Sequence, residues 1–526
     1  LKNGNLALVQ TPHHFYNPDP FLRNLHMEGR VPPEQHLFYH GIQLGNDFWN
    51  SAFFCGSCAL ISREALDEVG GLSQQTVTED AHTALQMHAK GWDSVFLDIP
   101  LAAGLATETF AFHVGQRIRW ARGMAQIFRT DNPLLKRGLT IPQRINYFNA
   151  AWHFFAGLPR LIFLIIPPIY LLWDLHPVDA DVREVLVYAI PHLLLEGLGA
   201  ATMHRNVRHS IWPEVYEVAI APYTALVTSM AMVFPRWGRF NVTTKGSQLE
   251  KRTFDVRNTS PHLIILGLLL AGLAALPGKL YDQPLDQETI LVAAAWNVYN
   301  VIILLAAIAA GLERPQRRAH HRIEREARVS IGRRPRQVLG IDGLEPMRGR
   351  STDLSMGGLS LRLEGAHQLP ERLFLRFHSD VGKSSILEIE VVNHFVEGDT
   401  TVVRARFERL TPEQEADLSR QIFSVDDAWL HDEFTYDSPG RSALVVVLAP
   451  FSALLGNPAW MRRFMRGQSQ PSASLVPADR VSQLHPSRLG LGPMLTPVAL
   501  VTLSVGLAVG WSPLVRAFSR YLPVTE

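Results

Sequence analysis

Apolar and polar positions divide the 526-residue chain into four blocks, of which the first covers residues 1–145. In this block, short apolar runs such as Leu6–Gln10 and Ser94–Ile99 alternate with helical patterns such as Ser62–Val69, which a Gly-Gly pair follows. Strands that alternate with helices are typical of a mixed or parallel sheet flanked by helices. We therefore predict an α/β domain.

The second block, residues 146–312, is predominantly apolar. Four runs have about the length that crosses a bilayer as a helix: Ala150–Trp173, Val185–Met203, the shorter Leu263–Leu276, and Thr289–Leu312. A fifth run, Tyr216–Phe234, is interrupted by Glu217 and Pro222. We interpret this fifth run as an interfacial helix and predict a bundle of four membrane spans.

Charged residues in the links between these runs predict their orientation. Two links are acidic, Asp174–Asp181 and Lys279–Glu288, and three are basic, Lys136–Arg144, His204–His209 and Arg236–Arg257. Under the positive-inside rule the basic links are cytoplasmic, and four spans place both flanking regions there too, in a multi-pass membrane protein. Arg160 and Glu196 lie inside predicted spans, which indicates either a polar bundle interior or a structural contact between helices.

The last two blocks are residues 313–425 and 426–526. In the first, four runs alternate as strands do and predict a β-barrel of about a hundred residues: Gly357–Leu363, Arg372–His378, Ile386–Val392 and Thr401–Phe407. In the second, we expect amphipathic helices at Ser442–Leu455 and Ala459–Arg466. The apolar run Leu495–Val515 fits either a further membrane helix or a buried helix.

Composition excludes some functions. A net charge of +1 gives no sign of a nucleic-acid binder. Cys55 and Cys58 are the only cysteines, too few to staple a chain of this size, and buried thiols facing a reducing cytosol are favoured over a zinc site. The chain opens at Leu1 without a methionine and runs into a strand, so we expect a fragment that lacks an N-terminal part.

Thr78-Glu79-Asp80 opens a predicted helix and is the first candidate for chemistry. An acid at a helix N-terminus is stabilised by free backbone N–H groups and the helix dipole, which explains an isolated tripeptide of this kind. The functional interpretation makes Asp80 a general base.

Gln116, Arg119 and Trp120 form a Q-x-x-R-W motif about thirty-five residues later. On a helix these positions share one face, where an indole offers a platform for a sugar ring and a guanidinium offers a fork for a diphosphate. An amphipathic interfacial helix with a Trp at the headgroup level is the alternative, and both can hold at once.

Together these motifs resemble the processive family 2 glycosyltransferases of the cellulose synthase type. Phe53–Ser57, then Thr78–Asp80, then Q-x-x-R-W, stand in that order before the membrane runs, and Gln10–Phe15 followed by Asn17–Pro20 is also similar to bacterial cellulose synthases. The resemblance implies a GT-A domain that transfers glucose from UDP-glucose to a growing β-1,4-glucan and secretes the polymer.

The resemblance also implies roles for individual residues. Asp80, within Thr78-Glu79-Asp80, would be the catalytic base, and Cys55 would lie near the channel mouth. Trp120 would stack on the terminal glucose, with Gln116 and Arg119 at the acceptor and diphosphate site. A gating loop over the nucleotide is implied for residues 236–257 by an F-x-V-T-x-K match made of Phe240, Val242, Thr243 and Lys245. Without the other motifs, this loop would pass for an ordinary basic juxtamembrane segment.

One departure concerns the metal. The family binds Mg²⁺ and UDP through acidic motifs, including a D-x-D, that we expect upstream of residue 1. The D-x-D in this sequence, Asp179-Ala-Asp181, falls in a link predicted to be external. We therefore expect the chain alone to be inactive.

A second constellation resembles the PilZ domain, a cyclic di-GMP receptor. It consists of an R-x-x-x-R cluster and a D-x-S-x-x-G motif on the predicted barrel, with candidate ligand residues Arg317, Arg318, Arg322, Asp353, Ser355 and Gly358. Arginine forks suit guanine edges and phosphates. An Arg cluster after a membrane span explains the first motif but not the second.

Regulation and partners follow from the resemblance. It implies activation by cyclic di-GMP, with a linker Arg that tethers the gating-loop region to Glu108, and a periplasmic membrane-anchored accessory subunit beside the lipid-embedded spans. Two alternatives stay open: a non-catalytic PilZ-regulated channel or receptor, and a synthase of another β-linked polysaccharide.

Overall fold

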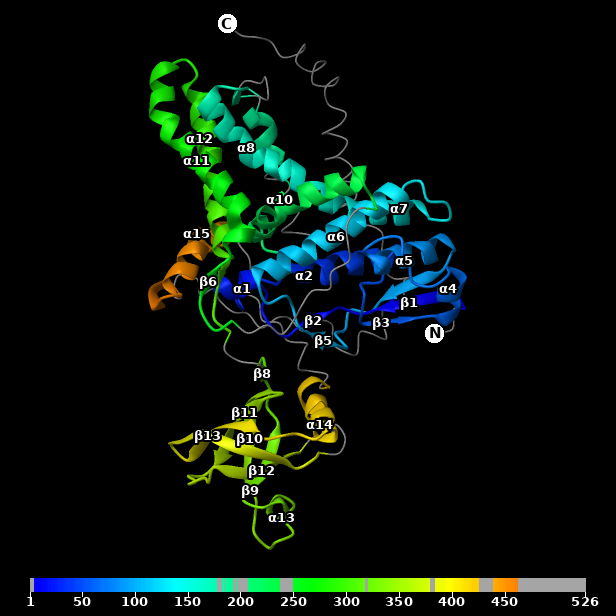
Figure 1. Ribbon diagram of the computed structural model, residues 1–526, viewed down its shortest axis with the longest axis vertical. Coiled ribbons are helices and arrows are strands. Elements are labelled where there is room, and N and C mark those ends of the chain that lie inside the picture. Colours follow the sequence, from blue (N-terminus) through cyan, green and yellow to red (C-terminus); the bar gives the residue numbers. More distant parts are fainter. Residues whose placement is uncertain are drawn as a thin grey trace.

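The computed structural model describes residues 4–176, 182–183, 185–192, 195, 207–236, 249–316, 320–378, 384–424 and 439–461 (Figure 1). Several sequence predictions lie outside these residues: most of the run Val185–Met203 with Glu196, Asp179 and Asp181, the loop residues Phe240, Val242, Thr243 and Lys245, the pair Arg317 and Arg318, and the run Leu495–Val515.

The N-terminal region is an α/β domain. Its main sheet has the order β3-β1-β4, with β1 (Leu6–Gln10) antiparallel to β3 (Ala59–Ile61) and parallel to β4 (Asp93–Phe96). A smaller parallel pair joins β2 (His14–Phe15) to β5 (Ala103–Gly104). The helices are α1 (Pro20–Asn24), α2 (Glu34–Leu37), the π-helix η1 (Phe38–Gln43), α3 (Leu44–Phe48), α4 (Arg63–Glu68), α5 (Glu79–Ala89) and α6 (Phe110–Thr130).

Helices α5 and α6 cover one side of this sheet (Figure 1). The core between them contains Leu8 from β1, Leu85 from α5, and Met124 and Ile127 from α6, all less than a tenth exposed. Burial of this apolar surface fixes α6 above the N-terminal end of α5, where the Thr78–Asp80 motif lies.

The helical bundle follows, with α7 (Ile141–Trp152), the 3₁₀-helix η2 (His153–Ala156), α8 (Gly157–Trp173), α10 (Trp212–Val233), α11 (Val256–Asp282) and α12 (Gln287–Ala309). In the described part of the chain, four helical stretches are long and apolar enough to cross a membrane: Ile141–Trp173, Trp212–Val233, Val256–Asp282 and Gln287–Ala309.

Three of the four predicted spans overlap these stretches, and the fourth, Val185–Met203, lies mostly outside the described residues. The short run Leu263–Leu276 extends to 27 residues in α11, through Pro261 and Pro277. The stretch expected to be interfacial is α10, which has the length of a span but runs alongside α6 and across the direction of α11 and α12 (Figure 1). Its course in the structure accords with the interfacial interpretation.

The third region is a closed β-barrel, as predicted. Its sheet has the order β11-β14-β13-β12-β9-β10-β8, and β10 also pairs with β11, which closes the barrel. The strands are β8 (Ile323–Glu324), β9 (Arg328–Gly332), β10 (Met347–Ser355), β11 (Gly358–Glu364), β12 (Arg372–His378), β13 (Leu387–Glu397) and β14 (Thr400–Phe407), with α13 (Pro335–Val338) after β9 and α14 (Pro412–Phe423) at the end. Inward side chains such as Leu361, Leu375 and Ile389 are fully buried.

Two further elements join the regions. A short ladder pairs β6 (Thr253–Phe254), just before α11, with β7 (Leu312–Glu313), just after α12. Helix α15 (Pro439–Leu455) packs against α12 and α10. The barrel lies at the opposite end of the molecule from α8, α11 and α12 (Figure 1).

Candidate glycosyltransfer and ligand sites

Asp80 lies in the first turn of α5, next to a loop formed by Phe53–Ser57. Its Oδ1 atom accepts a hydrogen bond of 2.8 Å from the backbone N–H of Ala81. Burial, assisted by the charge of Glu79, raises the pKa of Asp80 to about 6 against the lowering effect of that hydrogen bond. A carboxylate with such a pKa accepts a proton readily near neutral pH.

The loop beside Asp80 approaches closely because it contains a glycine. Gly56 has φ +85°, and a Cβ atom built on it would lie 3.2 Å from Asp80 Oδ2. Cys55 is also near, since burial and then the charge of Asp80 raise the pKa of its thiol. This environment keeps Cys55 protonated, which agrees with a structural role rather than a nucleophilic one.

Gln10 at the end of β1 holds this loop in place. Its fully buried side chain accepts from the backbone N–H of Cys55 (3.0 Å) and donates to the carbonyl of Ser57 (2.9 Å). Thr11 adds a hydrogen bond from its Oγ1 to the carbonyl of Cys58 (2.9 Å). The sequence named Gln10 and Thr11 only as part of a family resemblance. Their contacts show that both residues hold the segment from Cys55 to Cys58 in place.

Helix α6, which bears the Q-x-x-R-W motif, packs against the start of α5. Gly123 of α6 has Thr78 against it: a Cβ there would lie 2.4 Å from Thr78 Oγ1, so the glycine permits the close approach. Burial lowers the pKa of Arg119 and the nearby Glu79 carboxylate opposes this, which places the two side chains close to each other. Gln116, like Arg119 and Trp120, is partly buried.

Arg117, inside the same motif, was missed as a functional candidate. Its guanidinium carbon lies 4.3 Å from the centre of the Trp120 ring, and the same group forms an ion pair with Glu34 of α2. This cation–π contact fixes the indole and occupies one of its faces. Arg117 stands three residues before Trp120, a spacing that places two side chains side by side on a helix, and this spacing was the signal in the sequence for their contact.

Among the described residues, no three His, Cys, Asp or Glu side chains are placed together so that they could hold a metal ion. The described residues therefore do not fit the Mg²⁺ that the resemblance implies, and no step below depends on it.

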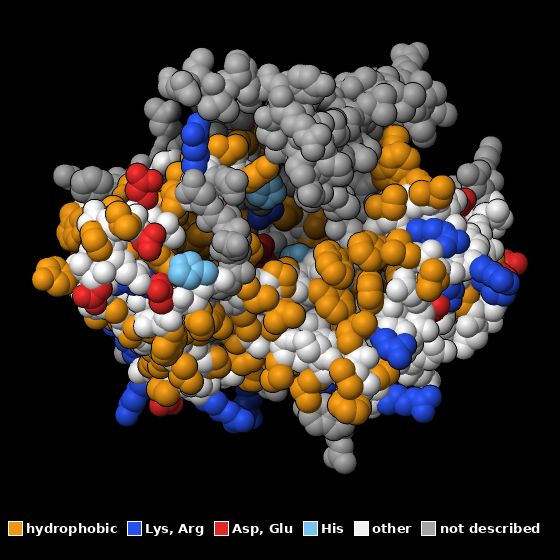
Figure 2. All heavy atoms as spheres, turned by 90° about the horizontal axis from the view of Figure 1, so that it is seen from above, with side chains coloured by type: hydrophobic (Ala, Val, Ile, Leu, Met, Phe, Trp, Pro, Cys, Tyr) orange, Lys and Arg blue, Asp and Glu red, His pale blue; other side chains and the backbone are white. Residues whose placement is uncertain are grey.

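A polar hollow opens within the helical bundle. Arg160 of α8, predicted to face a polar interior, forms ion pairs with Glu214 and Glu217 of α10. Arg160 and Glu217, with His153, line a small hollow with a volume of ≈ 20 Å³. Figure 2 shows a hollow in this end of the molecule with acidic, basic and histidine side chains inside it.

The barrel brings two of the ligand candidates, Arg322 and Asp353, into direct contact. Arg322, just before β8, donates from Nη1 to Asp353 Oδ1 (2.7 Å) and to Ser360 Oγ (2.8 Å). Ser355 and Gly358 face each other across the β10–β11 turn, with Ser355 Oγ donating to the Gly358 carbonyl (2.9 Å). Arg322 and Asp353 thus converge as the two motifs predicted.

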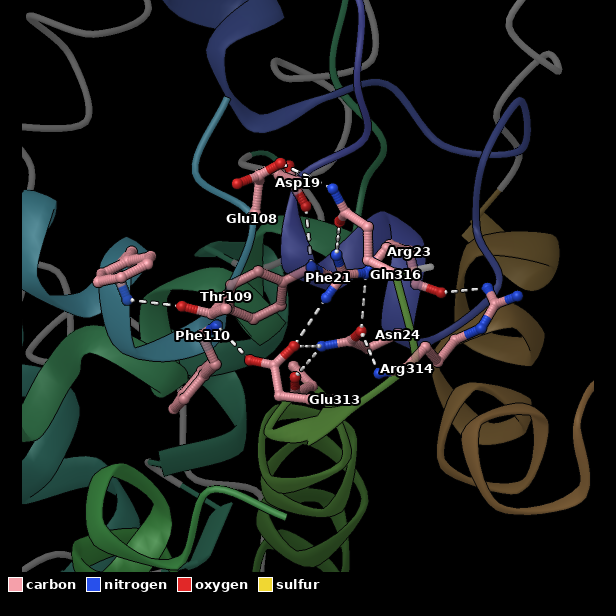
Figure 3. Close-up of polar contacts among 12 residues, drawn as sticks. Asp19, Phe21, Arg23, Asn24, Glu108, Thr109, Phe110, Glu313, Arg314 and Gln316 are labelled. Atoms are coloured by element: carbon pink, nitrogen blue, oxygen red, sulfur yellow. Dashed lines mark hydrogen bonds and ion pairs between the residues drawn. The ribbon is translucent and has the colours of Figure 1, made fainter. Parts of the chain in front are cut away.

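Glu108 lies at the junction between the barrel linker and α6. Its Oε1 accepts from Gln316 Nε2 (2.8 Å) and lies 3.1 Å from His321 Nε2. Gln316 also accepts from Arg23, which pairs with Glu313 at 2.8 Å (Figure 3). The linker therefore does reach Glu108, through Gln316 and His321 among the described residues.

Comparisons with known proteins agree with this architecture. Residues 1–198 match the family described as "Glycosyl transferase family group 2", and residues 316–424 match the PilZ domain. A cellulose synthase 1 catalytic subunit (UDP-forming) from Komagataeibacter xylinus is 40% identical over 497 residues, 91% of this chain and 63% of the relative. A cellulose synthase catalytic subunit from Pseudomonas fluorescens is 43% identical over 432 residues, 82% of this chain and 57% of the relative.

The solved PilZ domain with c-di-GMP of YcgR from Escherichia coli aligns with 20% of this chain and 89% of its own, at 22% identity and a TM-score of 0.16. The chain spans about three fifths of the length of the cellulose synthase relatives named above. With its group 2 glycosyltransferase region, its apolar helices that fit a membrane protein and its PilZ domain, the chain is a homologue of the cellulose synthase catalytic subunits over most of its length.

Proposed function

We propose that this chain is part of a processive β-1,4-glucan synthase that uses UDP-glucose and is activated by cyclic di-GMP. The observation that carries the proposal is the position of Asp80: a buried carboxylate with a pKa of about 6, below a glycine loop and beside the helix that bears Arg119 and Trp120. The homology to UDP-forming cellulose synthases supports the choice of donor and polymer.

In this proposal Asp80 takes the proton from the 4-hydroxyl of the terminal glucose of the glucan. The hydroxyl oxygen forms a bond to C1 of the donor glucose, the bond from C1 to the diphosphate breaks, and UDP leaves with the electron pair. Trp120 supports the terminal sugar ring on the face that Arg117 does not cover, while Arg119 and Gln116 contact the diphosphate and the acceptor. Thr78 and Glu79 position Asp80, and Cys55 lies beside the acceptor.

The polymer then leaves through the helical bundle, past the hollow lined by Arg160 and Glu217. A channel for a sugar chain needs polar walls inside an apolar exterior, and the ion pairs of Arg160 with α10 supply them. We place the α/β domain and the barrel on the cytoplasmic side of a bacterial inner membrane, on the strength of the basic links. Phe240, Val242, Thr243 and Lys245 serve as the gating loop, and a periplasmic accessory subunit receives the polymer.

Cyclic di-GMP binds at the barrel in this proposal. Arg322, already aligned by Asp353, presents a guanidinium for a guanine edge or a phosphate, and Arg317 and Arg318 complete the cluster. Ser355 and Gly358 allow the ligand to approach the backbone of the β10–β11 turn.

The test is Asp80→Asn in the complete subunit, with incorporation of labelled UDP-glucose into membranes as the readout. Polymer synthesis should fall by at least about a thousandfold, because a general base is lost at the attacking oxygen, while cyclic di-GMP affinity measured by calorimetry stays unchanged. Asp67→Asn, on the exposed helix α4, is the matched control and should keep synthesis.

Three outcomes would contradict parts of the proposal. Synthesis retained by Asp80→Asn removes this residue from the role of base. A product that resists a β-1,4-glucanase indicates another β-linked polysaccharide. No polymer from the folded, unsubstituted subunit favours a non-catalytic PilZ-regulated channel.

A further inference from the structure

Helix α15 is apolar around its whole circumference, although the sequence pattern predicted an amphipathic helix. Residues 442–461 contain no Asp, Glu, Lys, Arg or His. A helix of this composition in a globular protein is buried on all sides, since an apolar face left in water costs free energy.

One face of α15 is buried against the bundle. Val445, Val446 and Ala449 are at most 1% exposed and belong to the same core as residues of α10 and α12. Both ends are fixed by polar contacts: Ser442 Oγ accepts from the backbone N–H of Ile211 (3.0 Å), and Arg252 donates to the carbonyl of Leu454 (3.3 Å). The orientation of the helix is therefore determined.

The opposite face is an exposed apolar stripe, which we define as Leu444, Val447, Phe451 and Leu454. Their spacing of three, four and three residues places them on one side of the helix, and they are 39%, 41%, 52% and 61% exposed. Trp460, just after the helix, is 52% exposed as well. Nothing polar interrupts this surface.

The bilayer is the occupant that fits the stripe. α15 packs against α12, one of the four helices long enough to cross a membrane, whose outer side chains Leu291 and Val298 are also exposed and apolar. α15 lies beside the end of α12 that is nearer the barrel (Figure 1). With 17 residues α15 is short for a crossing, and arginines, Arg441 and Arg252, lie at its two ends where lipid headgroups would be.

We propose that α15 is an interfacial anchor whose exposed stripe lies in the acyl region of the cytoplasmic leaflet, with Trp460 at the headgroup level. The proposal rests on the membrane placement proposed above for the bundle. Its consequence concerns the PilZ domain: residues 316–424 are attached to the membrane region on both sides, by α12 before them and by α15 after them.

The test measures the lipid contact directly. Phe451→Cys is labelled with an environment-sensitive fluorophore, NBD, in the chain reconstituted in vesicles of phosphatidylcholine and phosphatidylglycerol. The matched control is Leu344→Cys, a 58% exposed apolar residue between α13 and β10. Helix α13 lies at the end of the barrel away from the bundle (Figure 1). The parent chain, with Cys55 and Cys58, gives the background labelling.

Nitroxide-labelled phosphatidylcholine should quench the label at residue 451 at least about threefold more than the label at residue 344, and aqueous iodide should do the reverse. Leu454→Cys should give the same result and protects the test against a folding defect at one position. A label at 451 that iodide reaches as readily as at 344 refutes the proposal. A label shielded from both quenchers also refutes the proposal, because protein then covers the stripe. If that protein is residues 462–526, a chain that ends at Met461 exposes the label. If it is a second copy of the chain, dilution exposes the label.

Discussion

Asp80→Asn should stabilise the chain at neutral pH although it removes the proposed catalytic base. The ordinary pKa of an aspartate is 3.8, and burial raises that of Asp80 to about 6. Because the folded pKa lies above the unfolded one, protonation of Asp80 stabilises the fold. That contribution is fully present below pH 3.8 and is lost as the pH rises through about 6.

The magnitude follows from the shift. A difference of about 2.2 pKa units, at about 1.36 kcal/mol each, corresponds to ~3 kcal/mol that the ionised carboxylate costs the folded state above pH 7. The neutral amide of Asn does not carry this cost, and its oxygen still accepts from the N–H of Ala81. Part of the Asp80 side chain is exposed, so ~3 kcal/mol is the upper end of the expected gain.

The assay is thermal unfolding of the 526-residue chain in detergent at pH 7.5 and pH 4.5. The thermal midpoint of Asp80→Asn should exceed that of the parent chain by several degrees at pH 7.5, and the difference should fall to about a third of that value at pH 4.5. Asp67→Asn, on an exposed surface, should show no such pH dependence. An equal midpoint for Asp80→Asn and the parent chain at both pH values would refute the argument that burial strains this carboxylate.

Other substitutions test the surroundings. Gly56→Ala and Gly70→Ala both place a side chain at φ near +85°, and each should lower the unfolding free energy by about 1–2 kcal/mol. Only Gly56→Ala should also lower polymer synthesis, by about tenfold or more, because only its Cβ meets the Asp80 carboxylate. Arg322→Ala should weaken cyclic di-GMP binding by at least about tenfold in calorimetry, whereas Arg350→Ala, on the exposed side of β10, should leave it unchanged. Glu313→Gln should lower the unfolding free energy by about 3 kcal/mol in denaturant titrations, because it breaks a buried ion pair.

The sequence predicted the elements that are determined by a local pattern of apolar and polar residues. The barrel strand Arg372–His378 was predicted with its observed bounds, because apolar side chains alternate there without interruption. Strand β10 was not predicted, although it contains Asp353. Its residues Met347–Ser355 are mostly polar or charged, and pairing with β9 and β11 rather than alternation holds it in the sheet.

Contacts between distant segments could not be read from local patterns. The course of α10 depends on its ion pairs with Arg160, which is 54 and 57 residues from Glu214 and Glu217. The motif residues were identified, but nothing local indicated that Gln10 organises the loop beside Asp80. The apolar pattern of α15 was visible too, yet only packing showed which of its faces stays uncovered.

Glu108 connects the linker that precedes the barrel to the α/β domain. Glu108 is 2% exposed and directly precedes Thr109, the residue that caps the α6 helix bearing the Q-x-x-R-W motif. His321, which contacts Glu108, directly precedes Arg322, the residue proposed to bind cyclic di-GMP. Gln316 also forms a backbone pair with Leu249, which joins the linker to the segment that follows the proposed gating loop.

Because a buried carboxylate that loses its partners costs several kcal/mol, the linker position and the start of α6 are energetically coupled. Glu313, which precedes the linker, also contacts the start of α6. Its carboxylate accepts a hydrogen bond of 2.6 Å from the backbone N–H of Phe110, the first residue of that helix (Figure 3). Arg23 and Asn24 of α1 donate to the same carboxylate. Hydrogen bonds of Glu108, Gln316 and Glu313 thus join the linker before the barrel to the start of α6.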